Sequence, residues 1–176
     1  MKKILFFLML STAVLASSST QAGGGFRGQF VVVNDLEPGF GAGAHLLVGQ
    51  YPFFFYPNID FWFASHSYDY MIWHHDHWDY YNSPDYHVYE IAFNMDVKFS
   101  FPVKPVSPYM GFGVCPVVTG YEGGYNDSYT NFGFNAFGGI GFRLNRSSSC
   151  FLELRGKMGN GYNIFKMSFG MTFYGS

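Results

Sequence analysis

The stretch that decides the fold is HVYEIAFNMDVKFSF, residues 87–101. Its odd-numbered positions are mainly apolar or aromatic, whereas its even-numbered positions carry three charges and an amide. Side chains of a β-strand alternate between the two faces of the sheet, so the pattern predicts a strand with one apolar and one polar face. The stretch is longer than an ordinary soluble strand of about 5–6 residues. It is long enough for a tilted membrane-spanning strand, which needs about 9–11.

The same alternation recurs along the chain and indicates eight candidate strands. The other seven are 26–34, 40–48, 53–65, 108–119, 132–144, 150–155 and 165–173. The connections between them are rich in Gly, Pro, Asn, Asp and Ser, which favour turns. If the first strand starts in the periplasm, the two longest connections, 65–85 and 121–130, fall on the outer side. This parity is typical of outer-membrane barrels, which have short periplasmic turns and longer outer loops.

The first 22 residues have the layout of a secretory signal peptide. Lys2 and Lys3 are followed by an apolar run to Ala16 and by a small, polar segment to Ala22. The apolar run is too short for a membrane-spanning helix, which needs about 20 residues. We predict cleavage after Ala22, with cleavage after Ala16 as the alternative, and a single domain at 23–176.

The composition excludes several classes of function. Aromatic residues make up 22% of the chain and charged residues only 12%, about half the usual quarter. Without Lys2 and Lys3, eight basic residues stand against twelve acidic ones. This balance, with no basic cluster, argues against nucleic acid as a partner. No P-loop, dinucleotide fingerprint or zincin helix motif is present, so we predict no cofactor. Cys115 and Cys150 fall on predicted strands that are not neighbours, and we expect free thiols.

These features predict an all-β fold, a closed eight-stranded antiparallel up-and-down transmembrane β-barrel. Closure leaves no unpaired strand edge in lipid. The apolar face would then meet lipid, and the polar face would point inward, where opposite charges can pair. The predicted inward polar residues are Arg27, Gln29, His45, Asp60, Glu90, Asn94, Asp96, Lys98, Asn135, Arg143, Glu153, Arg155, Lys157 and Lys166. The alternative is a soluble secreted β-sandwich or lipocalin-like barrel, because alternation alone does not say which face meets lipid.

Three stretches resemble the small outer-membrane β-barrel proteins of the OmpA/OmpX-like type. They are PYMGFGV at 108–114, FNAFGGIGFRLN at 134–145 and CFLELRGKMG at 150–159, within a resemblance that covers 26–174. The resemblance implies a place in the outer membrane of a diderm bacterium, contact with membrane lipid and lipopolysaccharide, and insertion by the barrel assembly machinery. Members commonly end on an aromatic residue that this machinery reads. Here Phe173 and Tyr174 are followed by Gly175 and Ser176, so the chain departs from the family in the signal for assembly and not in the barrel itself.

The sharpest candidate site is HHDHWD, residues 74–79. In an extended segment His75, His77 and Asp79 share one side. Two His and one carboxylate can bind Zn²⁺ or Cu²⁺. The competing interpretation is a polar, aromatic loop exposed at the top of a hairpin, and the function we expect includes no metal.

A second candidate pair is Ser65 and His87, which flank the 65–85 connection on the apolar faces of adjacent predicted strands. One hairpin register makes them direct neighbours, and a Ser–His pair can support acyl transfer. Asp85 is close to His87 along the chain, but the sequence assures no acid that would orient the histidine. Some small outer-membrane barrels modify lipid A with a His and a Ser near the outer rim, so the resemblance makes such an enzyme one alternative. The other interpretation is that both are simply rim residues.

The expected function is a structural or surface-interaction role without catalysis. Loops 66–86 and 121–130 would contact an extracellular ligand. Eight strands enclose a space just wide enough for side chains, so we expect a closed lumen rather than a diffusion pore. A lipid A-modifying enzyme that uses Ser65 and His87, and a soluble secreted binding protein, are the alternatives.

Overall fold

The computed structural model describes residues 21–34, 36–66, 69–74, 77–82, 86–101, 103, 105–123, 127–159 and 163–175. The strands are β1 (Gln21–Val33), β2 (Gly39–Gln50), β3 (Phe53–His66), β4 (Asp69–His74), β5 (His77–Asn82), β6 (Tyr86–Ser100), β7 (Val106–Glu122), β8 (Asp127–Arg143), β9 (Ser148–Gly159) and β10 (Ile164–Tyr174). Within these residues no helix has the length and apolar character needed to cross a membrane.

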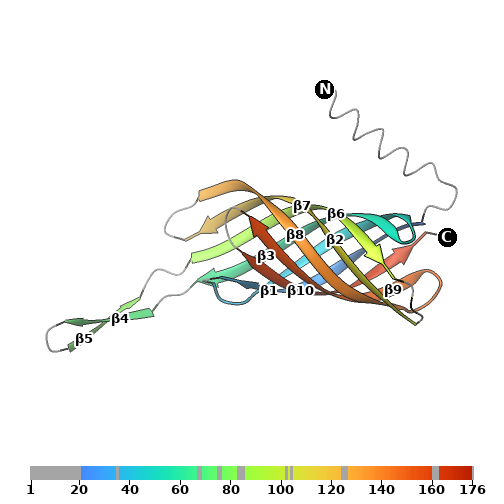
Figure 1. Ribbon diagram of the computed structural model, residues 1–176. Helices are drawn as coiled ribbons and strands as arrows, with labels where there is room; N and C mark the ends of the chain where they lie inside the picture. The colour runs from blue at the N-terminus through green and yellow to red at the C-terminus, as the bar shows by residue number, and fades with distance from the viewer. Residues whose placement is uncertain are drawn as a thin grey trace, which may run out of the picture.

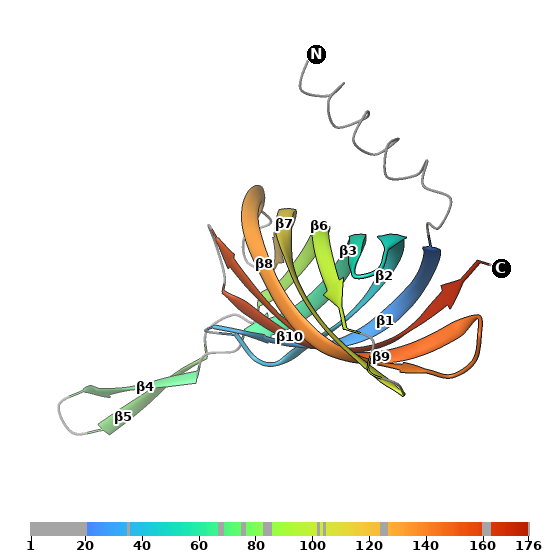
Figure 2. The ribbon, with the colours of Figure 1, turned by 45° about the vertical axis from the view of Figure 1, so that its right-hand side comes forward.

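Eight strands close into a barrel in the order β1-β10-β9-β8-β7-β6-β3-β2, with β2 pairing β1 again (Figure 1). Every neighbouring pair is antiparallel. The predicted eight-stranded up-and-down barrel is therefore confirmed. β4 and β5 form a separate two-stranded sheet beyond one end of the barrel in both views (Figures 1 and 2).

The two ends of the barrel differ. The end that we call the hairpin end holds connections 34–38, 67–85, 123–126 and 160–163. The opposite end, which we call the terminal end, holds connections 51–52, 101–105 and 144–147 together with the start of β1 and the end of β10. The two predicted long connections, 65–85 and 121–130, both fall at the hairpin end, but only 67–85 is longer than the connections at the other end, because β7 and β8 are joined by 123–126 alone. The predicted signal peptide lies outside the described residues except for Gln21 and Ala22, which open β1 and pair with Gly49 and Val48.

Two predicted loops contain more strand than expected. The connection 65–85 carries the β4–β5 hairpin, and most of 121–130 belongs to β7 and β8. The β7–β8 register continues without a break to the pair Tyr121 and Asp127. Backbone pairing needs no alternation of side chains. A ladder that continues past the region where one face is apolar therefore leaves no period-two signal in the sequence.

The decisive stretch places its apolar face outward. On β6 the side chains of Phe93, Met95 and Val97 are exposed, whereas those of Glu90 and Asp96 are buried. The same division holds around the barrel, where exposed outward residues include Phe26, Phe40, Leu46, Phe61, Phe112, Phe134, Leu152, Leu154, Met167 and Phe169. All the predicted inward polar residues are buried except Arg143, which is exposed at the terminal end. The predicted orientation of the two faces is confirmed.

The two cysteines are free, as predicted. Cys115 lies on β7 and Cys150 on β9, and β8 separates these strands in the barrel. The Cys115 thiol faces the interior, where its Sγ lies 3.4 Å from Asn135 Oδ1.

Candidate sites inside the barrel and at its two ends

The middle of the barrel holds a network of buried ion pairs. It forms because the polar side chains of the alternating strands point inward. Its charges balance within the described residues. The cations are Arg27, Arg155, Lys157 and Lys166, and the carboxylates are Asp60, Glu90, Asp96 and Glu153. They come from β1, β3, β6, β9 and β10, so the network ties strands together across the lumen.

Two guanidinium groups share one carboxylate at the centre of this network. Arg27 Nη1 donates to Glu153 Oε1 at 3.2 Å, and Arg155 Nη2 donates to the same oxygen at 3.0 Å. Arg27 also binds Asp60 through Nη2 at 2.6 Å, and Arg155 binds Asp96 through Nη1 at 2.5 Å. Burial of a charge is costly unless it is paired and hydrogen-bonded, and each of these groups meets that condition.

The lysines complete the network toward the hairpin end. Lys166 Nζ lies 3.2 Å from Asp60 Oδ2. The ammonium of Lys157 contacts the Glu90 carboxylate, which also accepts a hydrogen bond from Trp62 Nε1 at 3.0 Å. The ion pairs therefore extend in depth from Glu90 to Glu153.

Three asparagine side chains form a hydrogen-bonded chain that ends on the Asp96 carboxylate. Asn58 Nδ2 donates to Asp96 Oδ2 at 2.9 Å. Asn94 Nδ2 donates to Asn58 Oδ1 at 2.8 Å, and Asn135 Nδ2 donates to Asn94 Oδ1 at 2.6 Å. Networks of this kind fix side-chain positions because each partner satisfies the next.

Apolar layers close the interior on both sides of the network. The layer toward the hairpin end consists of Val31, Val33, Trp62, Ala64, Val88 and Ile164. The layer toward the terminal end, which we call the aromatic floor, consists of Leu47, Phe54, Tyr56, Tyr109, Phe137 and Phe151. All these side chains are buried. In depth the lumen is filled by an apolar layer, an ionic layer and a second apolar layer.

The hairpin end brings Ser65 and His87 together, as the sequence predicted for one register. They are opposite each other on β3 and β6, and Ser65 Oγ lies 3.1 Å from His87 Nδ1. On the other side of His87, the register of β6 and β7 places Glu122 opposite it. Glu122 is an acid that the sequence analysis did not connect with this pair, because its register was not readable. Asp85, which was connected with it, lies outside the described residues.

The His-rich tip differs from the straight segment assumed for it. β4 and β5 pair so that His74 lies opposite His77 and Ile72 opposite Asp79. The chain therefore reverses between His74 and His77, and one extended segment does not carry all three candidates. His75 and the side chains of His77 and Asp79 lie outside the description, so the metal site stays a prediction. Among the described residues no group of three or more metal-ligating side chains is present.

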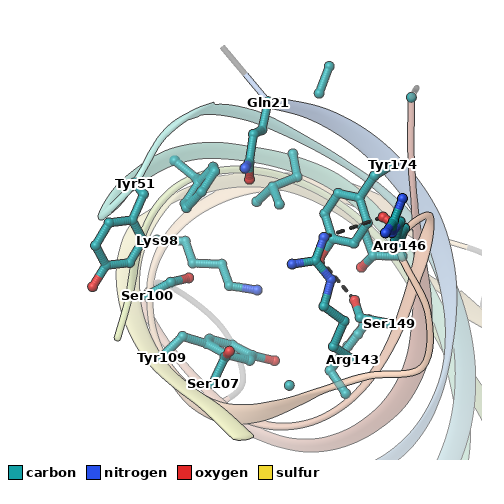
Figure 3. Close-up of a pocket in the computed structure, with 17 residues that line it drawn as sticks. Gln21, Tyr51, Lys98, Ser100, Ser107, Tyr109, Arg143, Arg146, Ser149 and Tyr174 are labelled. Carbon is teal, nitrogen blue, oxygen red and sulfur yellow. Dashed lines mark hydrogen bonds between the residues drawn. The ribbon is translucent and has the colours of Figure 1, made fainter. Parts of the chain in front are cut away.

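The terminal end holds a cavity of about 440 Å³ that the sequence analysis did not predict (Figure 3). Lys98, Arg143 and Arg146 line it together with aromatic side chains such as Tyr109 and Tyr174. Lys98 and Arg143 were predicted to face inward, but only as members of the polar face. What distinguishes them is that no carboxylate lines this cavity, which becomes visible only once the strands are placed.

The arrangement is similar to that of several solved structures. Superposition on Neisserial surface protein A gives a TM-score of 0.62 with 13% sequence identity, and the match covers 89% of this chain and 97% of that protein. For the N-terminal β-barrel domain of Pseudomonas aeruginosa OprF the TM-score is 0.58 and the sequence identity 11%, and the match covers 89% of this chain and 100% of that domain. The third structure is the attachment invasion locus protein Ail of Yersinia pestis, solved with the heparin analogue sucrose octasulfate. Its TM-score is 0.54 and its sequence identity 9%, and the match covers 89% of this chain and 97% of that protein.

The chain has the fold of the small outer-membrane β-barrels. No family model and no curated protein matches its sequence. The resemblance drawn from the three sequence stretches is confirmed at the level of the fold. The strands themselves carry the ion-pair network on their inward side and a belt of exposed apolar side chains, such as Phe93 and Phe134, on their outward side. Candidate sites are therefore restricted to the lumen, the rims and the loops.

Proposed function

We propose that this protein spans the outer membrane of a diderm bacterium and has a structural or surface-interaction role without catalysing a reaction. The observation that carries the proposal is the outward face of the barrel, where exposed Phe, Leu, Ile, Val and Met side chains surround a charged interior. Soluble monomers rarely expose a contiguous apolar surface of this kind. A bilayer would cover it, and the closed barrel leaves no strand edge in the hydrocarbon.

The filled interior supports a barrel that does not conduct. The layer around Trp62, the ion-pair network and the aromatic floor follow one another along the axis. Opening a path would require breaking buried ion pairs, which is strongly unfavourable. The role we propose therefore lies outside the lumen.

The hairpin end supports a surface-interaction role through loops 66–86 and 121–130. The β4–β5 hairpin and the ends of β7 and β8 extend beyond the barrel there (Figure 1). Paired strands present a more ordered surface than an unpaired loop of the same length. Ail, which has the same fold, was solved with a heparin analogue bound. This precedent favours binding of an extracellular ligand by a barrel of this fold.

Cysteine labelling in intact cells tests both the membrane and the orientation. In a chain with Cys115 and Cys150 replaced by Ser, Asn82→Cys in β5 should react with a membrane-impermeant maleimide. Ser147→Cys, which is exposed at the terminal end, should react only after the outer membrane is permeabilised. Equal reaction of both sites in intact cells would contradict the orientation. Recovery of the protein from the periplasm without detergent would contradict the membrane barrel.

A second candidate function, acyl transfer to or from a membrane lipid such as lipid A, is favoured by one observation. Ser65 Oγ lies within hydrogen-bond distance of His87 Nδ1 at the rim of the outward face. In such a reaction the Ser65 oxygen attacks an ester carbonyl while His87 accepts its proton and then returns it to the leaving alcohol. Glu122 lies opposite His87 in the β6–β7 register, so an acid is present on the neighbouring strand next to the pair.

Mass spectrometry of lipid A separates the two functions. If the enzyme is real, expression of the wild type changes the acyl pattern, and Ser65→Ala or His87→Ala abolishes the change. Ser128→Ala, at the same end on β8, is the matched control and should behave as the wild type. An identical acyl pattern with and without the wild-type gene would remove the enzyme and leave the non-catalytic role.

A further inference from the structure

The cavity at the terminal end contains a strong imbalance of charge. Lys98, Arg143 and Arg146 line it, and no carboxylate is among its lining residues. In Figure 3 the ammonium of Lys98 and the guanidinium of Arg143 both point into the open space. The cavity volume of about 440 Å³ is within the range of small-molecule sites.

Lys98 is the exceptional member of this set. Its side chain is buried, at 9% exposure, yet none of the ion pairs among the described residues involves it. Its Nζ lies 3.5 Å from the centroid of the Tyr109 ring and 5.0 Å from that of Tyr56. The ring faces attract a cation, but they satisfy none of its three N–H donors.

Arg143 is similarly short of an anionic partner. Its Nε and Nη2 donate to the backbone carbonyls of Asn145 and Arg146 at 3.3 Å. These contacts hold the guanidinium in place at the rim of the cavity. They leave its positive charge without a counter-charge among the described residues.

The rest of the interior shows how unusual this is. Deeper in the barrel each Arg and Lys has a carboxylate partner, and four cations face four carboxylates. Outside that network, the cations with described side chains gather at the terminal end. The corresponding carboxylates, Glu37, Glu122 and Asp127, lie at the hairpin end. The Tyr109 hydroxyl beside Lys98 donates to Glu153 at 3.2 Å, but that carboxylate is already shared by Arg27 and Arg155. A buried cation that forms no ion pair of its own is costly to maintain, which favours a ligand as the anionic partner of Lys98.

The walls of the cavity add an apolar component. Tyr109, Phe151, Leu47 and Phe54 belong both to the cavity lining and to the aromatic floor, which closes its inner side. Toward the rim, the hydroxyls of Ser149 and Tyr174 lie 2.9 Å apart. A ligand would therefore meet cations at one part of its surface and ring faces at another.

We propose that this cavity binds a small organic anion, a carboxylate or phosphate monoester carried on a ring or another compact apolar group. Lys98 and Arg143 bind the anionic head, and Tyr109 and Phe151 contact the apolar body. The site opens at the terminal end of the barrel, opposite the hairpin. It is independent of the surface-interaction role, because the two lie at opposite ends and the filled lumen separates them.

Calorimetric titration of the full mature barrel in uncharged detergent tests the site with phenyl phosphate as the probe. Benzyl alcohol has the ring without the charge, and inorganic phosphate has the charge without the ring. Phenyl phosphate should bind, and both reference compounds should bind at least several-fold more weakly. Equal binding of benzyl alcohol would overturn the role of the cations, and equal binding of inorganic phosphate would overturn the role of the apolar walls.

Substitutions assign the binding to the named residues. Lys98→Met should weaken phenyl phosphate binding by roughly tenfold or more, the scale of one charge-assisted hydrogen bond. Ser128→Asp changes the net charge by the same amount at the hairpin end and should leave binding unchanged. If Lys98→Met does not fold, two milder variants replace it: Lys98→Arg, which keeps the positive charge, and Arg143→Gln, which changes an exposed residue. The former should retain binding and the latter should weaken it. Binding unchanged in folded Lys98→Met or in Arg143→Gln would overturn the proposal.

Discussion

At the residue scale, Asp60 organises the ion-pair network. Its carboxylate lies within 2.6–3.3 Å of donors on four side chains, which are Arg27, Gln29, Asn94 and Lys166. The sequence indicated that Asp60 points inward, because it stands on the polar face of its strand. Its partners come from β1, β6 and β10, and no local pattern relates those positions. Only the closed barrel brings them within hydrogen-bond distance.

Removal of this charge should destabilise the barrel strongly. Asp60→Asn keeps the shape of the side chain but leaves Arg27 and Lys166 without a shared carboxylate. Breaking a buried pair in this way costs about 3–5 kcal/mol. Denaturant unfolding of the barrel in lipid vesicles, followed by Trp fluorescence, measures the change. Asp127→Asn, which removes an exposed carboxylate, should stay within about 0.5 kcal/mol of the wild type. Equal stability of the two variants would show that the network contributes little.

Glycine allows the strands to approach the network closely at Gly43. A Cβ at this inward position would lie 2.3 Å from Asp60 Oδ1 and 2.7 Å from the Ile59 carbonyl oxygen. Gly43→Ala should therefore lower the free energy of unfolding by about 1–3 kcal/mol through overpacking. Gly28 is the matched control, because it points outward and nothing lies within 4 Å of its Cβ position. In the same unfolding assay Gly28→Ala should change stability by less than about 0.5 kcal/mol. A reversed order would contradict the inward packing.

At the scale of the element, the β4–β5 hairpin is separate from the barrel. Its two strands pair with each other, and the barrel sheet closes without them. The sequence predicts a connection in this region, because its residues show neither clean alternation nor an apolar face. Cross-strand partners such as Trp73 and Trp78 become recognisable only when the reversal after His74 is known.

Deletion of the hairpin should leave the barrel intact. His66 lies opposite Tyr86 in the β3–β6 register, so Asn-Gly in place of residues 67–85 joins the strands by a two-residue turn. The midpoint of denaturant unfolding should match that of the full chain, because no pair of the barrel ladder is lost. The heat-dependent shift of the folded band on gels provides an independent check of folding. Failure of this variant to fold would show that the hairpin supports the barrel.

At the scale of the whole molecule, the direction of the two faces separates a membrane barrel from a soluble one. Both folds produce alternating strands, and both have a closed topology. Here the charges are inside and the exposed positions are apolar, as the buried Glu90 and the exposed Phe93 on opposite faces of β6 show. The charged side chains that the structure describes therefore lie in the lumen or at the two ends of the barrel. The outward belt is left for lipid.

A charge on this belt should have an effect that depends on depth. Phe93 lies in the middle of β6 and is 47% exposed. Phe93→Arg should destabilise the barrel in lipid vesicles by about 2–4 kcal/mol, whereas Leu144→Arg at the terminal end should cost about 0–1 kcal/mol. Denaturant unfolding in vesicles measures both. In a soluble protein an exposed Phe→Arg change would be nearly neutral, so equal stability of Phe93→Arg and the wild type would contradict the membrane barrel.

Alternation in the sequence predicts the eight strands of the barrel and, apart from Arg143, which polar side chains are buried inside it. Alternation is a local property, since each strand records the two environments of its own faces, as residues 87–101 do. Tertiary structure alone decided what depends on register and closure. It brought Ser65 to His87, joined Arg27 to Asp60 and Glu153, and reversed the chain at the His-rich tip. It also left Lys98 in a cavity without a carboxylate. These contacts join residues far apart in the chain, and the spacing of residues along one strand carries no information about its neighbours.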